Sequence, residues 1–153
     1  MDASVDPLVV FFLDERRFAL RLANVERIIP ILDITPLPKA PDVVLGVINV
    51  RGSVYPVVDI RSRFALPTRE PLLSDHLMLA RTSNRALALI VDQVAGVDTH
   101  PRAAITATRG LYHALEYVSG VLKLDDGLIL IHDLNSFLSP DEDWILAGAL
   151  RSA

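Results

Sequence analysis

Short runs of apolar residues, separated by turn-forming residues, follow one another along most of the chain. Runs of this length that are rich in Val, Ile, Leu and Phe are typical of β-strands. The pattern therefore predicts strands at residues 8–13, 17–22, 25–32, 44–50, 54–58, 76–80, 86–91, 94–97, 117–124 and 128–132. Pro56 lacks an N–H, so we expect an unpaired edge at that point of its strand.

Four segments depart from this pattern. Three prolines exclude regular structure from residues 35–41. Residues 99–113 show no clean period, and we expect a loop there with at most a short helical turn. The spacing at 59–66 is helical, with Asp59 as a candidate N-cap. The clearest helix is predicted at 139–150, because a capping serine, a proline at the first helical position and three acids in the first turn begin it.

The chain contains an internal repeat. Residues 46–60 can be placed on residues 120–134 without gaps, and residues 8–28 on residues 77–97, with glycine, aspartate and apolar positions in register. The chain is thus interpreted as one domain, residues 1–153, with related β halves at about 8–66 and 77–138 and the C-terminal helix after them. Five short strands suit a small SH3-like or OB-like barrel. Since neither half is large enough for a robust core, we expect a mainly β fold of two five-stranded, pseudo-symmetric barrels packed over a shared core.

The two copies differ at the tip of their equivalent hairpins. The second copy has Asp125-Asp126-Gly127, an ordinary turn sequence, where the first has Arg51-Gly52-Ser53. Gly52 supplies the positive φ that a tight turn demands. The turn does not require Arg51, which makes this arginine a candidate binding residue.

Composition narrows the classes of function. The 153 residues are 51% hydrophobic, yet no apolar run reaches the 18 residues of a membrane-spanning helix, and the first residues do not resemble a secretory signal. The chain has no cysteine, which excludes disulfides, thiolate zinc sites and a cysteine nucleophile. These features predict a cytoplasmic protein without direct membrane insertion.

Candidate chemistry is sparse. The four histidines lack the spacing of a helical metal pair, and no nucleotide-binding, kinase or hydrolase motif is present, so we expect no catalytic residue, no metal and no cofactor. A hydrolase using His132 or His113 is the weakest alternative. A small-barrel module for single-stranded nucleic acid is another, but the net charge of −4 and the 6% aromatic content disfavour nucleic acid. We interpret the cluster Arg61, Arg63 and Arg69 as a solvated helix face.

One stretch carries a family resemblance. The sequence LPKAPDVVLGVINVRGSVYPVVDIRSRF, residues 37–64, is similar to the CheW-like adaptors of bacterial chemotaxis, whose pattern runs G-[VI]-x-N-[LV]-R-G-x-[VI]-x-P-[VI]-[VI]-D-[LI]-R. Residues 9–28, 87–97 and 119–138 match the family in the same order, so the resemblance covers almost the whole chain. It implies two pseudo-symmetric five-stranded barrels and no catalysis.

The resemblance also implies partners. Such adaptors bridge the cytoplasmic tips of methyl-accepting chemoreceptors to the regulatory domain of a CheA-type histidine kinase. The receptor tip is expected in a groove near the junction of the barrels, and the carried-over positions are Val25, Arg27, Gly46, Asn49, Arg51 and Gly52. Kinase contact is implied through the end of a barrel, but no short motif assigns its residues.

Arg27 departs from the family pattern. The family commonly has V-x-E-[VI] where this chain has Val25-Glu26-Arg27-Ile28, and the family glutamate is expected to pair with the hairpin arginine. Two like charges in a partly buried groove cost free energy unless they are screened or paired. Three arrangements remain open: Glu26 serves instead, Arg51 finds another acid, or the site faces a more acidic partner. The departure would suit a particular receptor or another pathway, such as surface motility.

Overall fold

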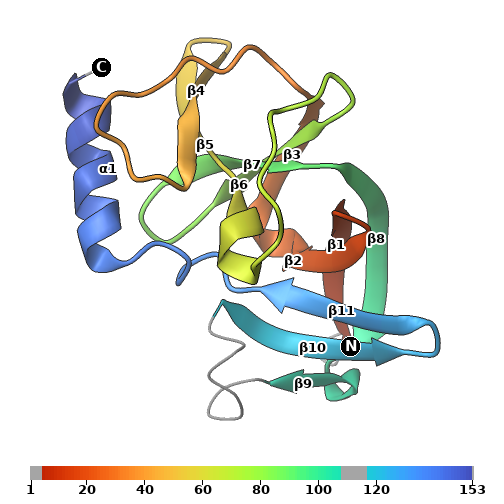
Figure 1. The fold of residues 1–153 in the computed structure, drawn as a ribbon. Coiled ribbons are helices and arrows are strands. Elements are labelled where there is room, and N and C mark those ends of the chain that lie inside the picture. Colours follow the sequence, from red (N-terminus) through yellow and green to blue (C-terminus); the bar gives the residue numbers. More distant parts are fainter. Residues whose placement is uncertain (1–4, 108–116, 153) are drawn as a thin grey trace.

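Two β-sheets and a C-terminal helix make up the computed structural model, which describes residues 5–107 and 117–152 (Figure 1). The six-stranded sheet has the order β8 (Gln93–Pro101), β1 (Val5–Leu13), β2 (Arg16–Arg21), β11 (Gly127–His132), β10 (Val118–Leu124) and β9 (Ile105–Ala107). The five-stranded sheet has the order β3 (Val25–Pro30), β6 (His76–Arg81), β7 (Ala86–Val91), β5 (Ser53–Val58) and β4 (Val44–Val50). The helical elements are the 3-10 turns η1 (Leu22–Asn24), η2 (Ile60–Phe64) and η3 (Arg102–Ala104), and α1 (Pro140–Ser152).

The two halves of the sequence exchange strands. Each sheet joins the first two strands of one half to the later strands of the other: β1 and β2 lie with β8 to β11, and β6 and β7 lie with β3 to β5. A barrel made from one sequence half alone, as the repeat boundaries suggested, is therefore wrong. The repeat itself is confirmed at the two parallel joins, where Ala19 pairs with Ile131 and Ala88 pairs with Val57. These four residues are equivalent in the two copies.

Three apolar clusters correspond to two barrel interiors and the layer between them. Each sheet curls around a cluster of its own side chains, and equivalent repeat positions fill the two interiors, such as Leu8 and Leu77 or Ile131 and Val57. The third cluster, here called the shared core, joins both sheets to α1. It includes Val9, Phe11, Leu13, Phe18, Leu20, Val44, Val58, Met78, Leu87, Leu89, Val91, Leu146 and Ala149. The expected fold, two barrels over a shared core, is confirmed.

The repeat extends to backbone irregularities. The β4–β5 ladder shifts register just before Gly46, and the β10–β11 ladder does so just before Gly120. At Gly46 (φ +157°) an added Cβ would lie only 2.2 Å from the carbonyl oxygen of Thr35, which exchanges backbone hydrogen bonds with Val47. Gly46 is therefore required by the close approach of the backbone at this edge.

Most local expectations hold. Pro56 lies opposite Val47 in the β4–β5 ladder, but the backbone of Val47 forms its hydrogen bonds with Thr35 and not with Pro56. On its other side β5 pairs with β7 only at Val57 and Val58. The expected unpaired edge at Pro56 is therefore confirmed. The segment 99–113 was expected to be a loop, which is wrong in part. It completes β8 and forms η3 and β9, since pairing with β1 and β10 stabilises strands that periodicity alone does not indicate. The remainder of that segment, 108–113, lies outside the described residues.

Candidate functional site

The β4–β5 hairpin ends in a turn in which both central residues have left-handed backbone. Val50 pairs with Ser53, and Arg51 and Gly52 between them have φ of 51° and 89°. Two positive φ values define a type I′ turn, which favours Asn, Asp or Gly at its first central position. A left-handed conformation costs an L-residue about 1–2 kcal/mol, so arginine is a strained choice here.

Two of the candidate residues have structural roles in the hairpin itself. The side-chain carbonyl of Asn49 accepts a hydrogen bond from the Gly52 N–H at 2.7 Å. Gly46 is buried and permits the close approach of the Thr35 backbone, as described above. Arg51, in contrast, is exposed, and its guanidinium makes no ion pair in the described part of the chain. Of the hairpin candidates, Arg51 alone has an exposed charged side chain.

The second hairpin shows that the fold does not impose this arrangement. Neither Asp125 nor Asp126 has a positive φ, whereas Gly127 does (φ 136°). The second tip is therefore a turn without a strained side-chain residue. The repeat explains the hairpin but leaves the strained arginine of the first tip unexplained.

Val25 and Arg27 lie on β3, an edge strand of the five-stranded sheet. The β3–β6 ladder pairs Val25 with Ala80 and Arg27 with Leu79, so Glu26 is the extra residue of a β-bulge. The Glu26 carboxylate lies 3.8 Å from the Arg81 guanidinium, which argues against its pairing with Arg51. Arg27 is exposed, and it makes no ion pair with any acid among the described residues. The sheet order puts their strands at opposite edges.

The repeat adds residues that the motif did not indicate. Val94 on β8 is equivalent to Val25, and both are half-buried against the shared core. Three residues further on, Ile28 and its equivalent Val97 are 42% and 55% exposed. The β8 side could have been found by carrying Val25 through the repeat. We call Val25, Arg27, Ile28, Val94 and Val97 the junction surface.

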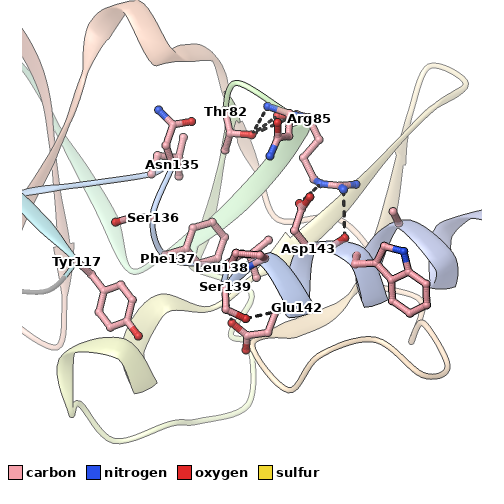
Figure 2. A pocket seen from close by; sticks show the side chains of 15 residues that line it. Thr82, Arg85, Tyr117, Asn135, Ser136, Phe137, Leu138, Ser139, Glu142 and Asp143 are labelled. Carbon is pink, nitrogen blue, oxygen red and sulfur yellow. Dashed lines mark hydrogen bonds and ion pairs between the residues drawn. The ribbon is translucent and has the colours of Figure 1, made fainter.

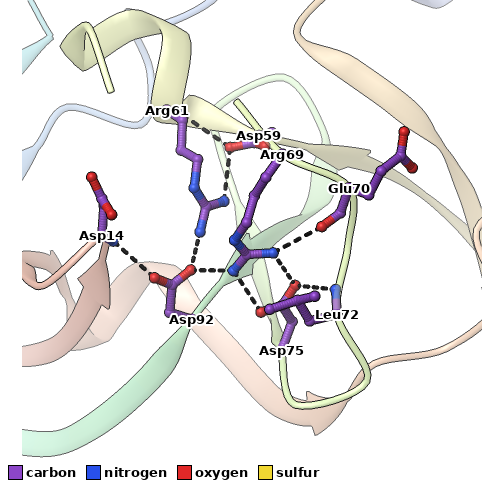
Figure 3. A network of polar contacts seen from close by, with 8 residues as sticks. All are labelled: Asp14, Asp59, Arg61, Arg69, Glu70, Leu72, Asp75 and Asp92. Atoms are coloured by element: carbon purple, nitrogen blue, oxygen red, sulfur yellow. Dashed lines mark hydrogen bonds and ion pairs between the residues drawn. The ribbon is translucent and has the colours of Figure 1, made fainter. Parts of the chain in front are cut away.

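A cluster of charges lies where the two barrels meet η2 (Figure 3). Arg61 is 2% exposed and bonds to the carboxylates of Asp59, at 3.2 Å, and Asp92. The solvated helix face predicted for Arg61, Arg63 and Arg69 is therefore wrong for Arg61. Asp59 caps η2 through the Arg61 N–H, as predicted. The sequence concealed this burial because the partner Asp92 lies far along the chain.

The same cluster extends to Arg69 and Asp75. Two hydrogen bonds, of 2.9 and 2.8 Å, join the Arg69 guanidinium to the Asp75 carboxylate, and a third reaches Asp92 at 2.6 Å. Burial raises the pKa of Asp75, but hydrogen bonds from Arg69 and the Leu72 N–H outweigh it and hold that pKa below the ordinary value. All three arginines are engaged with acids, since Arg63 pairs with Glu142.

His132 has no catalytic arrangement. It is 3% exposed, its Nδ1 lies 3.0 Å from the Tyr117 carbonyl oxygen, and Nε2 has no partner in the described part of the chain. Phe64 and Phe137 pack edge-on against the ring. Burial lowers its pKa to about 4, so the ring is neutral near pH 7. His113 lies outside the described residues.

A hollow of about 760 Å³ lies beside the start of α1 (Figure 2). Its charged groups bind one another: Arg85 donates to Asp143 at 3.0 Å, and Glu142 accepts from Arg63 and from the Ser139 N–H. The Glu142 N–H donates in turn to the Ser139 hydroxyl, which completes a capping box. These pairs dock α1 and leave no free acid or base for chemistry in the hollow.

No group of three or more His, Cys, Asp or Glu among the described residues could hold a metal ion. No helix among them is both long and apolar enough to cross a membrane.

Comparison with known proteins accounts for the hairpin and the two-barrel arrangement together. A model of the CheW-like domain family matches residues 7–142. The chain belongs to the CheW-like family. The chemotaxis protein CheW of Rhizobium meliloti is 31% identical over 137 residues, 88% of each chain. That of Thermotoga maritima is 30% identical over 128 residues, 84% of each chain.

The fold agrees with a solved member of the CheW-like family. The crystal structure of the scaffolding protein TtCheW from Thermoanaerobacter tengcongensis superposes with a TM-score of 0.80 at 27% identity, covering 90% of this chain and 94% of that one. The family resemblance stated from the sequence is thus confirmed.

Proposed function

We propose that this CheW-like protein is a non-enzymatic adaptor that couples the cytoplasmic tips of chemoreceptors to the regulatory domain of a CheA-type histidine kinase. Its relatives carry the name chemotaxis protein, and its structural neighbour is titled a scaffolding protein. The adaptor acts by bivalent binding. Holding the kinase close to the receptor lets a conformational change in the receptor bias the kinase.

The strained arginine of the hairpin carries this proposal. Arg51 occupies a turn position that favours Asn, Asp or Gly, and it is exposed and without an ion pair among the described residues. A residue that costs folding free energy where no contact repays it is a candidate for binding. Arg51 would donate to an acidic group of the receptor tip, while Val25 and the other apolar residues of the junction surface supply contact area.

The alternatives lack comparable support. Nucleic-acid binding requires a cluster of free cations, and the one cluster that the sequence offered, Arg61, Arg63 and Arg69, is engaged with carboxylates. A hydrolase would require a nucleophile in hydrogen-bond reach of a base, and His132 bonds to a backbone carbonyl instead.

A binding assay tests the proposal. The affinity of the purified chain for the receptor tip and for the kinase regulatory domain from the same genome is measured by biolayer interferometry. Arg51→Ala is expected to weaken receptor binding by about tenfold, because a hydrogen bond between charged groups is lost. Kinase binding and stability should stay unchanged, since alanine and arginine bear the same strain at φ 51°.

Arg16→Ala is the matched control. Arg16 is also exposed and makes no ion pair among the described residues, and its replacement should leave receptor binding unchanged. If the folded wild-type chain binds neither partner, the adaptor role is refuted. If Arg51→Ala unfolds the protein or binds the receptor normally, the role assigned to Arg51 is wrong.

Arg27 is proposed to select the partner. An arginine on the exposed edge of β3 favours a receptor tip with an acidic residue at the facing position. Arg27→Glu should therefore change the order of affinities across a panel of receptor tips while the melting temperature stays the same. An unchanged order of affinities would remove Arg27 from the site.

A further inference from the structure

An apolar hollow of about 430 Å³ lies beside the charge cluster, with which it shares Glu70 and Leu72. Three of its leucines are unusually exposed: Leu73 is 97%, Leu72 50% and Leu32 40% accessible to solvent. We call this hollow the leucine pocket. Its lining residues are Ile31, Leu32, Asp33, Ile34, Leu45, Glu70, Pro71, Leu72 and Leu73.

The loop that carries Leu72 and Leu73 is held in one conformation. Asp75 is buried below it, accepts two hydrogen bonds from Arg69 and accepts a third from the Leu72 N–H at 2.8 Å. The Asp75 N–H closes the turn by donating to the Leu72 carbonyl oxygen at 3.0 Å. Arg69 is fixed in turn by Asp92. Because these hydrogen bonds hold the loop backbone, little backbone entropy is lost when a partner covers the leucines.

The rim of the leucine pocket carries only negative charge. Asp33 and Glu70 line it, no basic residue is among its lining residues, and neither acid makes an ion pair in the described part of the chain. Figure 3 shows the Glu70 carboxylate pointing away from the charge cluster, to which Glu70 contributes only its backbone carbonyl. Two unpaired carboxylates beside exposed leucines would complement an apolar surface bordered by cations.

The leucine pocket is separate from Arg51, the charged residue of the proposed receptor site. Leu45 and Arg51 are six residues apart along the β4 hairpin, whereas Ile31 follows Ile28, the nearest residue of the junction surface, by three residues on the β3 side. At about 3.3 Å per residue of extended chain, these separations are roughly 20 Å and 10 Å. A partner could occupy this pocket while Arg51 remains free.

We propose that the leucine pocket is a docking site for a segment of a partner protein whose apolar side chains are flanked by lysine or arginine. The leucines bury the apolar side chains, and Asp33 and Glu70 fix the orientation of the segment through the flanking cations. This gives the protein an additional binding surface, separate from the proposed Arg51 contact.

Two designed peptides test the proposal on the full chain. Both are helical, with leucine at i, i+3, i+4 and i+7, and they differ only in having lysine or glutamate on the flanks of that face. Titrations are followed by the methyl NMR signals of the chain. The lysine peptide should shift the signals of Leu72 and Leu73 and bind about tenfold more tightly than the glutamate peptide. The difference should shrink in high salt, as charges on the surface are screened.

Three variants make the result specific. Leu73→Ser, at a nearly fully exposed position, should leave the fold intact and weaken the lysine peptide at least fivefold. Asp33→Asn combined with Glu70→Gln should abolish the preference for the lysine peptide. Val54→Ser removes another exposed apolar residue, on β5, and should change nothing. Equal affinity for the two peptides, shifts confined to other surfaces, or no binding of either peptide would overturn the proposal.

Discussion

The buried His132 should make the stability of the protein depend on pH within the range from 7 to 5. In the folded chain the ring is 3% exposed and its pKa is lowered to about 4, because burial disfavours the charged form. In the unfolded chain the ring is solvated and titrates at its ordinary value of 6.5. Between these two pKa values the unfolded state binds a proton that the folded state does not.

The sign and size of the effect follow from this difference. Because the unfolded state takes up the proton, acidification favours unfolding, and stability falls as the pH drops below 6.5. Each pH unit contributes about 1.4 kcal/mol, so the free energy of unfolding should fall by about 2 kcal/mol between pH 7 and pH 5. Carboxylates with lowered pKa values, such as Asp75, lose their contribution only at more acidic pH.

Urea denaturation at pH 7 and pH 5 measures the effect. His132→Gln keeps an N–H donor for the Tyr117 carbonyl but does not titrate, so this variant should lose most of the pH dependence even if it is less stable at both values. A wild-type change below about 0.5 kcal/mol would refute the reasoning. A variant that keeps the full pH dependence would refute it as well.

Further predictions concern the charge cluster, the glycine of the edge and the helix cap. Arg61→Met should lower the free energy of unfolding by about 3 kcal/mol, because two carboxylates lose a buried partner; unchanged stability in urea denaturation would contradict this. Gly46→Ala should destabilise the protein by about 3 kcal/mol, since its Cβ would meet the Thr35 backbone. Gly120→Ala should destabilise it less, because the nearest atom, at 2.8 Å, belongs to the Ile105 side chain. Thermal unfolding that ranks the two variants in the opposite order would refute the comparison. Ser139→Ala should cost about 1 kcal/mol of stability through loss of the capping hydrogen bond, and calorimetry that finds no change would show that the ion pairs alone dock α1.

The pattern of apolar residues was sufficient to predict most strands, because an apolar run indicates directly that a segment is buried. It failed at 99–107, where pairing with β1 and β10 stabilises residues that carry no clear period of their own. For Arg61 the prediction was wrong in the opposite sense, because a residue expected to be solvated is buried. An arginine beside a helix start is normally solvated, and its burial depends on Asp92, which strand pairing brings to it from far along the chain.

The candidate site divides in the same way. Motif and turn chemistry were enough to single out Arg51 and to notice Arg27, because both are local departures from an expected pattern. The pairing of Glu26 with Arg81 and the placing of exposed leucines beside Asp33 and Glu70 are tertiary features. Side-chain partners that are distant in sequence have no local signature.

The sequence by itself determined that the chain is a repeat of two β units and which positions of each unit are equivalent. Only the tertiary structure decided that the units exchange strands, so that β2 joins β11 and β7 joins β5. The physical reason is that a hydrophobic pattern specifies which face of a strand is buried but not which copy of the partner strand covers it. Because the two copies present equivalent apolar faces, either pairing satisfies the pattern. Long-range packing over the shared core selects between them.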